Sequence, residues 1–70
     1  MNLELINSIT KQMEGISELT LEIPSHKFQE YFGSNWAIKN FINTMAGRYK
    51  LQITIKGDYY GNRTLKVVRE

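Results

Sequence analysis

The 70-residue chain contains no cysteine and only one proline. No apolar run in it approaches the roughly 20 residues that a membrane-spanning helix needs. Without cysteine, neither a disulfide framework nor a thiolate zinc site can supplement the core. The first residues also lack the basic start and apolar middle of a secretory signal. We therefore expect an intracellular, cytoplasmic protein that makes no contact with a membrane.

Motifs for catalysis and nucleotide binding are also missing. Neither GxxxxGK[ST] nor GxGxxG occurs in the sequence. His26 is the only histidine and Asp58 the only aspartate, so a metal centre with three or four ligands is not expected. Ser25, His26 and Asp58 supply the residue types of a hydrolase triad, but Ser25 is better explained as a helix cap and His26 as a surface residue. We expect neither an enzyme nor a bound cofactor.

The composition that is present fits a small globular domain. Hydrophobic residues make up 41% of the chain and aromatic residues 11%, which is too rich for a disordered segment. A chain of this length lies near the lower limit at which one core supports a fold, so it needs an efficient core or oligomerisation. We expect a single domain over residues 1–70.

Hydrophobic periodicity predicts six elements. Apolar side chains recur at helical spacing in residues 1–15, 24–33 and 34–49. They alternate with polar side chains, as in a half-buried strand, in residues 18–24, 49–57 and 63–70. We expect the three helices to end at Gly15, Gly33 and Gly47, because glycine adopts a left-handed conformation without strain. The expected caps are Ser25 for the second helix and Ser34 or Asn35 for the third.

The predicted order is helix, strand, helix, short turn, helix, strand, loop, strand, which gives an α+β fold with a small antiparallel sheet. This order resembles the winged helix-turn-helix, a superfamily of DNA-binding proteins. The resemblance is carried by SHKFQEYFGSNWAIKNFINTMAGRYK (25–50) for the helix-turn-helix and by ITIKGDYYGNRTLKV (53–67) for the wing. It implies a third helix in the major groove and a hairpin loop against the flanking backbone. The first strand, LTLEI, is longer than usual in that superfamily and leaves room for another arrangement of helices on a three-stranded sheet.

Charge is divided unevenly along the chain. Residues 1–33 carry two basic and five acidic side chains, whereas residues 34–70 carry seven basic and two acidic ones. The formal charges of the two parts are therefore −3 and +5. A basic half should attract an anion such as nucleic acid. The alternative is a solvated basic surface with no such partner.

Two groups of residues are candidates for binding DNA. On a helical wheel, the side of the third helix opposite its apolar stripe carries Asn35, Trp36, Lys39, Asn40 and Asn43. Asparagine can bond adenine, lysine can meet guanine or phosphate, and an aromatic ring can contact a thymine methyl. The alternative for Trp36 is that it folds back over the neighbouring helix or the hairpin as part of the core.

The second group lies on and beside the hairpin loop at residues 57–62. Its members could contact sugar and phosphate and are Lys56, Tyr59, Tyr60, Asn62 and Arg63. Neighbouring residues of a strand face opposite sides, so one tyrosine is expected to pack inward and the other to bind. Four further basic residues are expected to act electrostatically: Arg48, Lys50, Lys66 and Arg69.

These patterns favour a small sequence-specific DNA-binding protein that regulates transcription. We expect a homodimer on a two-fold-related site in double-stranded DNA, with Leu3 of the first helix as a candidate dimer contact. The alternative is a protein-binding module, an inhibitor or adaptor, anchored by Trp36, Tyr59 and Tyr60, since tryptophan, tyrosine and arginine are enriched at binding hot spots. RNA binding on the open face of the sheet ranks third, because that face lacks the aromatic residues of common RNA-binding sheets.

Overall fold

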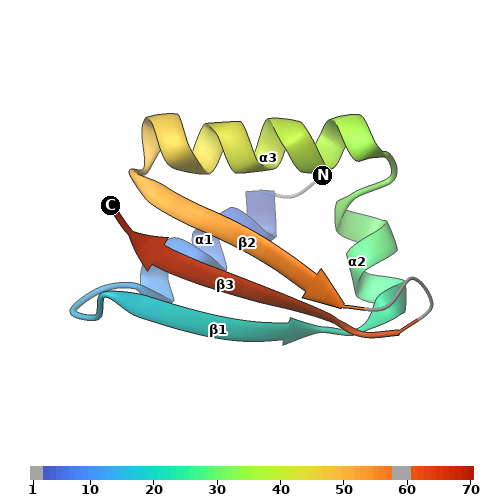
Figure 1. Ribbon diagram of the computed structural model, residues 1–70, viewed down its shortest axis with the longest axis horizontal. Coiled ribbons are helices and arrows are strands. Elements are labelled where there is room, and N and C mark those ends of the chain that lie inside the picture. Colours follow the sequence, from blue (N-terminus) through green and yellow to red (C-terminus); the bar gives the residue numbers. More distant parts are fainter. Residues whose placement is uncertain (1–2, 58–60) are drawn as a thin grey trace.

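The computed structural model describes residues 3–57 and 61–70 and contains three helices and three strands (Figure 1). In chain order the elements are α1 (Leu3–Gln12), β1 (Glu18–Ile23), α2 (Ser25–Tyr31), α3 (Asn35–Arg48), β2 (Leu51–Gly57) and β3 (Arg63–Arg69). The α+β class and the order of elements expected from the sequence are therefore confirmed.

The three strands form one antiparallel sheet in the order β1-β3-β2, so the last strand in the sequence is the central one. β1 pairs with β3 from Glu18 opposite Val68 to Ile23 opposite Arg63. β2 pairs with the other edge of β3 from Leu51 opposite Arg69 to Gly57 opposite Arg63. The long first strand seen in the sequence is thus paired over its whole length.

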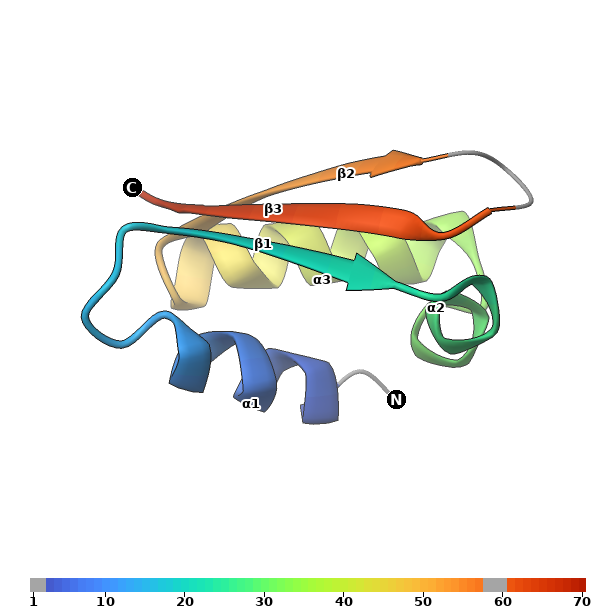
Figure 2. The same cartoon turned by 90° about the horizontal axis from the view of Figure 1, so that it is seen from below.

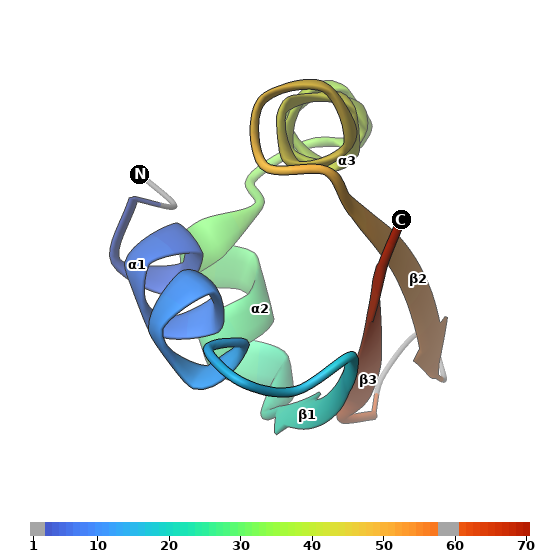
Figure 3. The same cartoon turned by 90° about the vertical axis from the view of Figure 1, so that its left-hand side faces the viewer.

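Alternation along the strands gives the sheet one apolar and one polar face. The apolar face is covered by α1 and α3, which both run along the strands on the same side of the sheet (Figures 2 and 3). α3 contributes the buried Phe41 and Met45, and β3 contributes the buried Leu65 and Val67. No described polar or charged side chain is buried, so the core depends on apolar packing alone.

The other face of the sheet carries three rows of side chains, polar except for Val68, with β1, β3 and β2 contributing one residue to each row. The central row is Thr20, Lys66 and Thr54. The flanking rows are Glu18, Val68 and Gln52, and Glu22, Thr64 and Lys56. β1 therefore places carboxylates on this face, whereas β3 and β2 place lysines there.

The end of α3 differs from the sequence-based expectation. Gly47 does not close the helix, which continues through Arg48, and the backbone N–H of Tyr49 still donates to the Met45 carbonyl. The residue with positive φ is Lys50, at 58°. Lys50 thus makes the left-handed turn into β2 that a glycine was expected to make, because the helical hydrogen bonds of α3 continue past Gly47 to Tyr49.

Expectations for the other helix ends were partly right. α1 ends at Gln12, and the turn that follows it contains Gly15 with φ of 79°, as expected of a left-handed glycine. α2 ends at Tyr31, two residues before Gly33. Ser25 does not cap α2: Pro24 occupies the cap position without a side-chain hydrogen bond, and Ser25 is already the first helical residue.

Arg69 has a structural contact rather than the purely electrostatic role expected of it. Its Nη2 donates to the main-chain carbonyls of Met13 at 2.6 Å and Ile16 at 3.2 Å. The Arg69 N–H also donates to the Ser17 carbonyl. The end of β3 therefore holds the connection between α1 and β1 in place.

Candidate nucleic-acid interface

The exposed side of α3 is polar and contains no acidic residue. Trp36, Asn40, Asn43 and Gly47 follow one another at intervals of three or four residues, so they form one line along the helix. Lys39 lies beside this line, and all five residues are exposed. With the exposed Asn35, the structure brings together every residue that the sequence assigned to a recognition helix.

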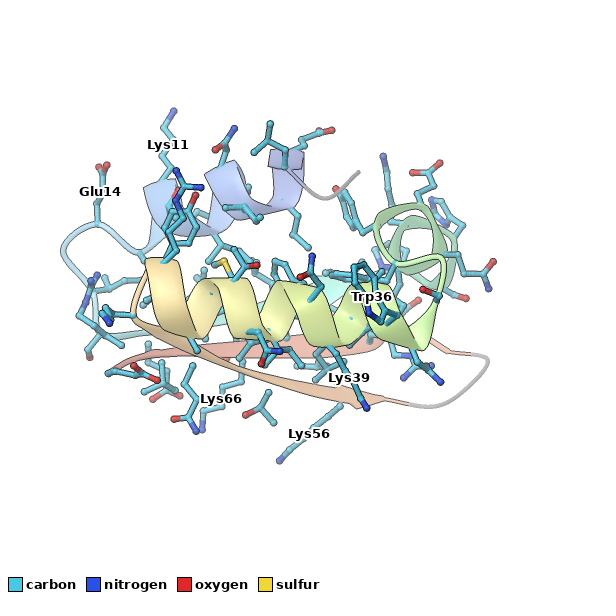
Figure 4. The ribbon with its side chains drawn as sticks, turned by 90° about the horizontal axis from the view of Figure 1, so that it is seen from above. Lys11, Glu14, Trp36, Lys39, Lys56 and Lys66 are labelled. Carbon is cyan, nitrogen blue, oxygen red and sulfur yellow. The ribbon has the colours of Figure 1, made fainter. Side chains whose placement is uncertain are left out.

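Trp36 lies outside the core. Its exposed fraction is 74%, the highest among the large hydrophobic residues described as exposed. Figure 4 shows it on the first turn of α3. The alternative in which Trp36 folds back as core is therefore wrong, because the first turn of α3 directs this side chain away from the sheet.

The start of α3 is fixed by a local cap and a short turn. The Ala37 N–H donates to Ser34 Oγ at 3.2 Å, which confirms Ser34 as the cap rather than Asn35. Residues 32–34 connect α2 to α3. In Figure 1, α2 lies below the first turn of α3 and runs steeply to it, whereas α3 is horizontal. Phe32 holds the corner, since its ring packs against Phe28 at 4.9 Å and Phe41 at 5.1 Å between centroids.

Basic side chains continue from α3 onto the sheet. Lys39, Lys56 and Lys66 extend to the same side of the molecule, whereas Lys11 and Glu14 extend to the opposite side (Figure 4). Lys66 forms an ion pair with Glu18 at 3.3 Å, and both partners are about half exposed. Lys39 and Lys56 form neither of the two ion pairs found among the described residues.

The structure describes the hairpin loop at residues 57–62 only in part. Tyr59 and Tyr60 lie outside the described residues, so the expectation that one packs and one binds stays a prediction. Asn62 is exposed, and its amide donates to the Glu22 carboxylate of β1 at 3.3 Å. This cross-strand contact was missed, and no local pattern in the sequence indicates it.

Arg63 is half-buried rather than extended into solvent as a wing residue. Its Cζ lies 4.9 Å from the ring centroid of the buried Phe28 in α2. The alternation of β3 already contains this information, because Arg63 shares its strand face with the buried Leu65 and Val67. The guanidinium is therefore held against α2 at the base of the hairpin.

Arg48 and Lys50 lie at the opposite end of α3 from Trp36. A helix of 14 residues is about 21 Å long, so these two cations are about one helix length from the first turn. Both are exposed, and Arg48 Cζ lies 5.8 Å from the ring centroid of Tyr49. The predicted residues thus form a group at the start of α3 and a second group at its end.

The described residues contain no cluster of three or more histidine, cysteine, aspartate or glutamate side chains that could hold a metal ion. His26 is exposed on α2, as expected. None of the helices in the described ranges is long and apolar enough to cross a membrane.

Comparison with known proteins adds no relative: no protein-family model, no curated protein and no solved structure matches this chain.

Proposed function

We propose that this chain is a winged-helix-type DNA-binding protein that reads double-stranded DNA with α3. The observation that carries the proposal is the exposed side of α3, where three asparagines, a lysine and a tryptophan gather without an acidic residue. Asparagine amides and a lysine match the donor and acceptor patterns of base edges in the major groove. An α-helix with its side chains is about 10–12 Å across, so it fits into a major groove about 12 Å wide.

The surroundings of α3 support the same function. The short corner between α2 and α3 presents the first turn of α3 at the surface, and Lys39 and Lys56 extend to one side of it. Phosphate contacts from these lysines would add sequence-independent affinity that falls as salt rises. The acidic residues Glu18 and Glu22 stand on β1, the edge of the sheet opposite β2.

The test is binding to labelled duplexes, measured by fluorescence anisotropy at two salt concentrations. The double variant Lys39→Ala/Asn43→Ala should bind more weakly and lose sequence preference in a selection from random duplexes. Asn7→Ala/Lys11→Ala is a matched control, because it removes the same two residue types at the same four-residue spacing from the exposed side of α1. Equal binding by the two double variants, or no binding by the wild type at low salt, would contradict the proposal.

We also propose a homodimer and a role in transcription regulation. One domain has a small footprint, and two copies on a two-fold-related site would double it. Leu3 at the start of α1 has an exposed fraction of 53%, so it is available as a dimer contact. Sedimentation of the wild type and of Leu3→Glu, with and without DNA, tests this assembly; a wild type that stays monomeric on its selected site would contradict it.

One observation favours a second candidate, a protein-binding module. A tryptophan exposed to 74% is a typical anchor for a protein interface. Under this function Trp36→Ala would abolish binding to a protein partner, and Lys39→Ala/Asn43→Ala would leave DNA binding as low as in the wild type.

A further inference from the structure

A cleft of about 270 Å³ lies where α2, the corner before α3 and the base of the hairpin meet. Phe28, Phe32 and Ile38 form its apolar part. Its polar groups come from three elements and one connection: Ser25 and Gln29 of α2, Ser34 before α3, Asn35 of α3 and Arg63 of β3. Among residues 3–57 and 61–70, no acidic residue lines the cleft.

Of the described residues that line the cleft, Arg63 is the one cation, and its side chain stacks on an aromatic ring. The guanidinium lies over the face of Phe28, which is only 6% exposed, with 4.9 Å between Cζ and the ring centroid. Stacking on a buried ring restricts a side chain that would otherwise move freely, so less entropy is lost when it binds a ligand. The ion pairs among the described residues are Lys27–Glu30 and Lys66–Glu18, and neither involves Arg63.

The lining of the cleft therefore favours an anion. A guanidinium presents a planar set of N–H donors that matches two oxygens of a phosphate, and charge-assisted hydrogen bonds of this type are the strong ones. The carboxamides of Gln29 and Asn35 are exposed and can donate to the remaining oxygens. A carboxylate could accept the same bonds, but phosphates are the anions that DNA presents beside its major groove.

We propose that this cleft binds one backbone phosphate of the DNA whose bases α3 reads. The inference rests on the proposed function and adds α2 to the interface, through Ser25 and Gln29. Asn35 directly precedes Trp36, so a phosphate held in the cleft would fix the position of the first turn of α3 along the groove. Phosphate contacts of this kind set the register of a protein on DNA without reading its sequence.

The first experiment compares Gln29→Glu with Gln12→Glu. Both variants change the net charge equally, and both positions are exposed on helices, but Gln12 lies on α1, outside the cleft. A carboxylate at residue 29 should repel the phosphate and weaken binding to the duplex about tenfold or more, while Gln12→Glu stays close to the wild type. Because Gln29 is exposed, this variant should fold normally, and circular dichroism checks that it does.

The second experiment measures the salt dependence of duplex affinity for Arg63→Met and Lys11→Met. Methionine keeps an apolar stem over Phe28 and removes the charge. One lost phosphate contact should reduce the slope of log affinity against log salt by about 0.9 for Arg63→Met, whereas the slope of Lys11→Met should stay unchanged. Arg63→Lys should keep the slope and still bind several-fold more weakly, since an ammonium lacks the planar donor set.

The outcomes separate this inference from the proposed function. If the wild type binds duplex but Gln29→Glu and Gln12→Glu bind equally, the cleft holds no phosphate and α3 alone carries the function. If the wild type binds no duplex, the proposed function itself fails. Inorganic phosphate at millimolar concentration and constant ionic strength provides a further test. If it shifts the NMR amide resonances of residues lining the cleft but does not compete with the duplex, the cleft binds a free anion and the inference is overturned.

Discussion

Two substitutions near the end of α3, Gly47→Ala and Lys50→Gly, test where this helix ends. In the structure Gly47 is the penultimate residue of α3, and a Cβ built on it meets no atom within 4 Å. Lys50 carries the left-handed turn, with φ of 58°. If the helix instead ended at Gly47, glycine would be needed there and Lys50 would lie in ordinary extended backbone. The two arrangements predict opposite signs for both substitutions.

The magnitudes follow from backbone conformational preferences. Glycine inside a helix is less favourable than alanine by about 0.5–1 kcal/mol, and Gly47 lies in the last turn of α3, so Gly47→Ala should raise the free energy of unfolding by about 0.5 kcal/mol. A left-handed conformation costs an L-residue roughly 1–2 kcal/mol, and glycine avoids this cost. Glycine also loses roughly 0.5–1 kcal/mol more conformational freedom on folding. The net gain expected for Lys50→Gly is therefore about 0.5–1 kcal/mol.

Urea denaturation followed by far-UV circular dichroism measures both changes. We expect higher urea concentrations at the unfolding midpoint and an unchanged slope of the free energy of unfolding against urea concentration. In a domain of this size, the melting temperature should rise by about 4–8 °C for each kcal/mol of added stability. A loss of stability in Gly47→Ala would refute the helix boundary described above. A loss in Lys50→Gly would refute the left-handed turn at that residue.

Three further substitutions test other contacts. Gly57→Ala should lower the free energy of unfolding by about 2 kcal/mol or more, because φ is 143° and the new Cβ would lie 2.6 Å from the Asn62 carbonyl oxygen. An unchanged melting temperature would contradict this geometry. Ser34→Ala should lower the free energy of unfolding by about 1 kcal/mol and Ser34→Gly by only a few tenths of a kcal/mol. Equal losses in the two variants would argue against Ser34 as the cap of α3. Arg69→Met should lower the free energy of unfolding by about 1 kcal/mol and speed amide hydrogen exchange in the connection between α1 and β1. Unaltered exchange there would contradict the structural role given to the Arg69 hydrogen bonds.

Much of the fold could be predicted because its core is made of local periodic patterns. The apolar residues at helical spacing in α1 are the ones that are buried, as are Phe41 and Met45 in α3. Strand alternation likewise separates the buried Leu51 and Ile53 from the exposed residues between them. These patterns depend only on neighbours within a turn or two, so tertiary structure did not change them.

Three of the errors share a physical cause, which is contact between residues distant in sequence. Arg69 bonds carbonyls of the α1–β1 connection, although it was expected to act only electrostatically, and Arg63 stacks on Phe28, although it was expected to contact the DNA backbone. The helix boundary at Lys50 likewise depends on pairing, because the Glu70 N–H donates to the Lys50 carbonyl. For the candidate site, the helical wheel correctly predicted that the polar side of α3 faces outward. A wheel describes one helix only, so it could not predict the cleft that α2, α3 and β3 form together.

The central position of β3 has a consequence for how the protein forms in the cell. β3 follows the other five elements in sequence, yet it is the strand that joins β1 to β2. While the ribosome is still extending the chain, neither edge strand has its neighbour, and α1 and α3 have no completed apolar face to cover. Pairing β1 with β3 also requires the long segment between them to close into a loop, which slows folding. Folding must therefore wait for the last strand, and the exposed surface of α3 takes its final position only after β3 has been synthesised.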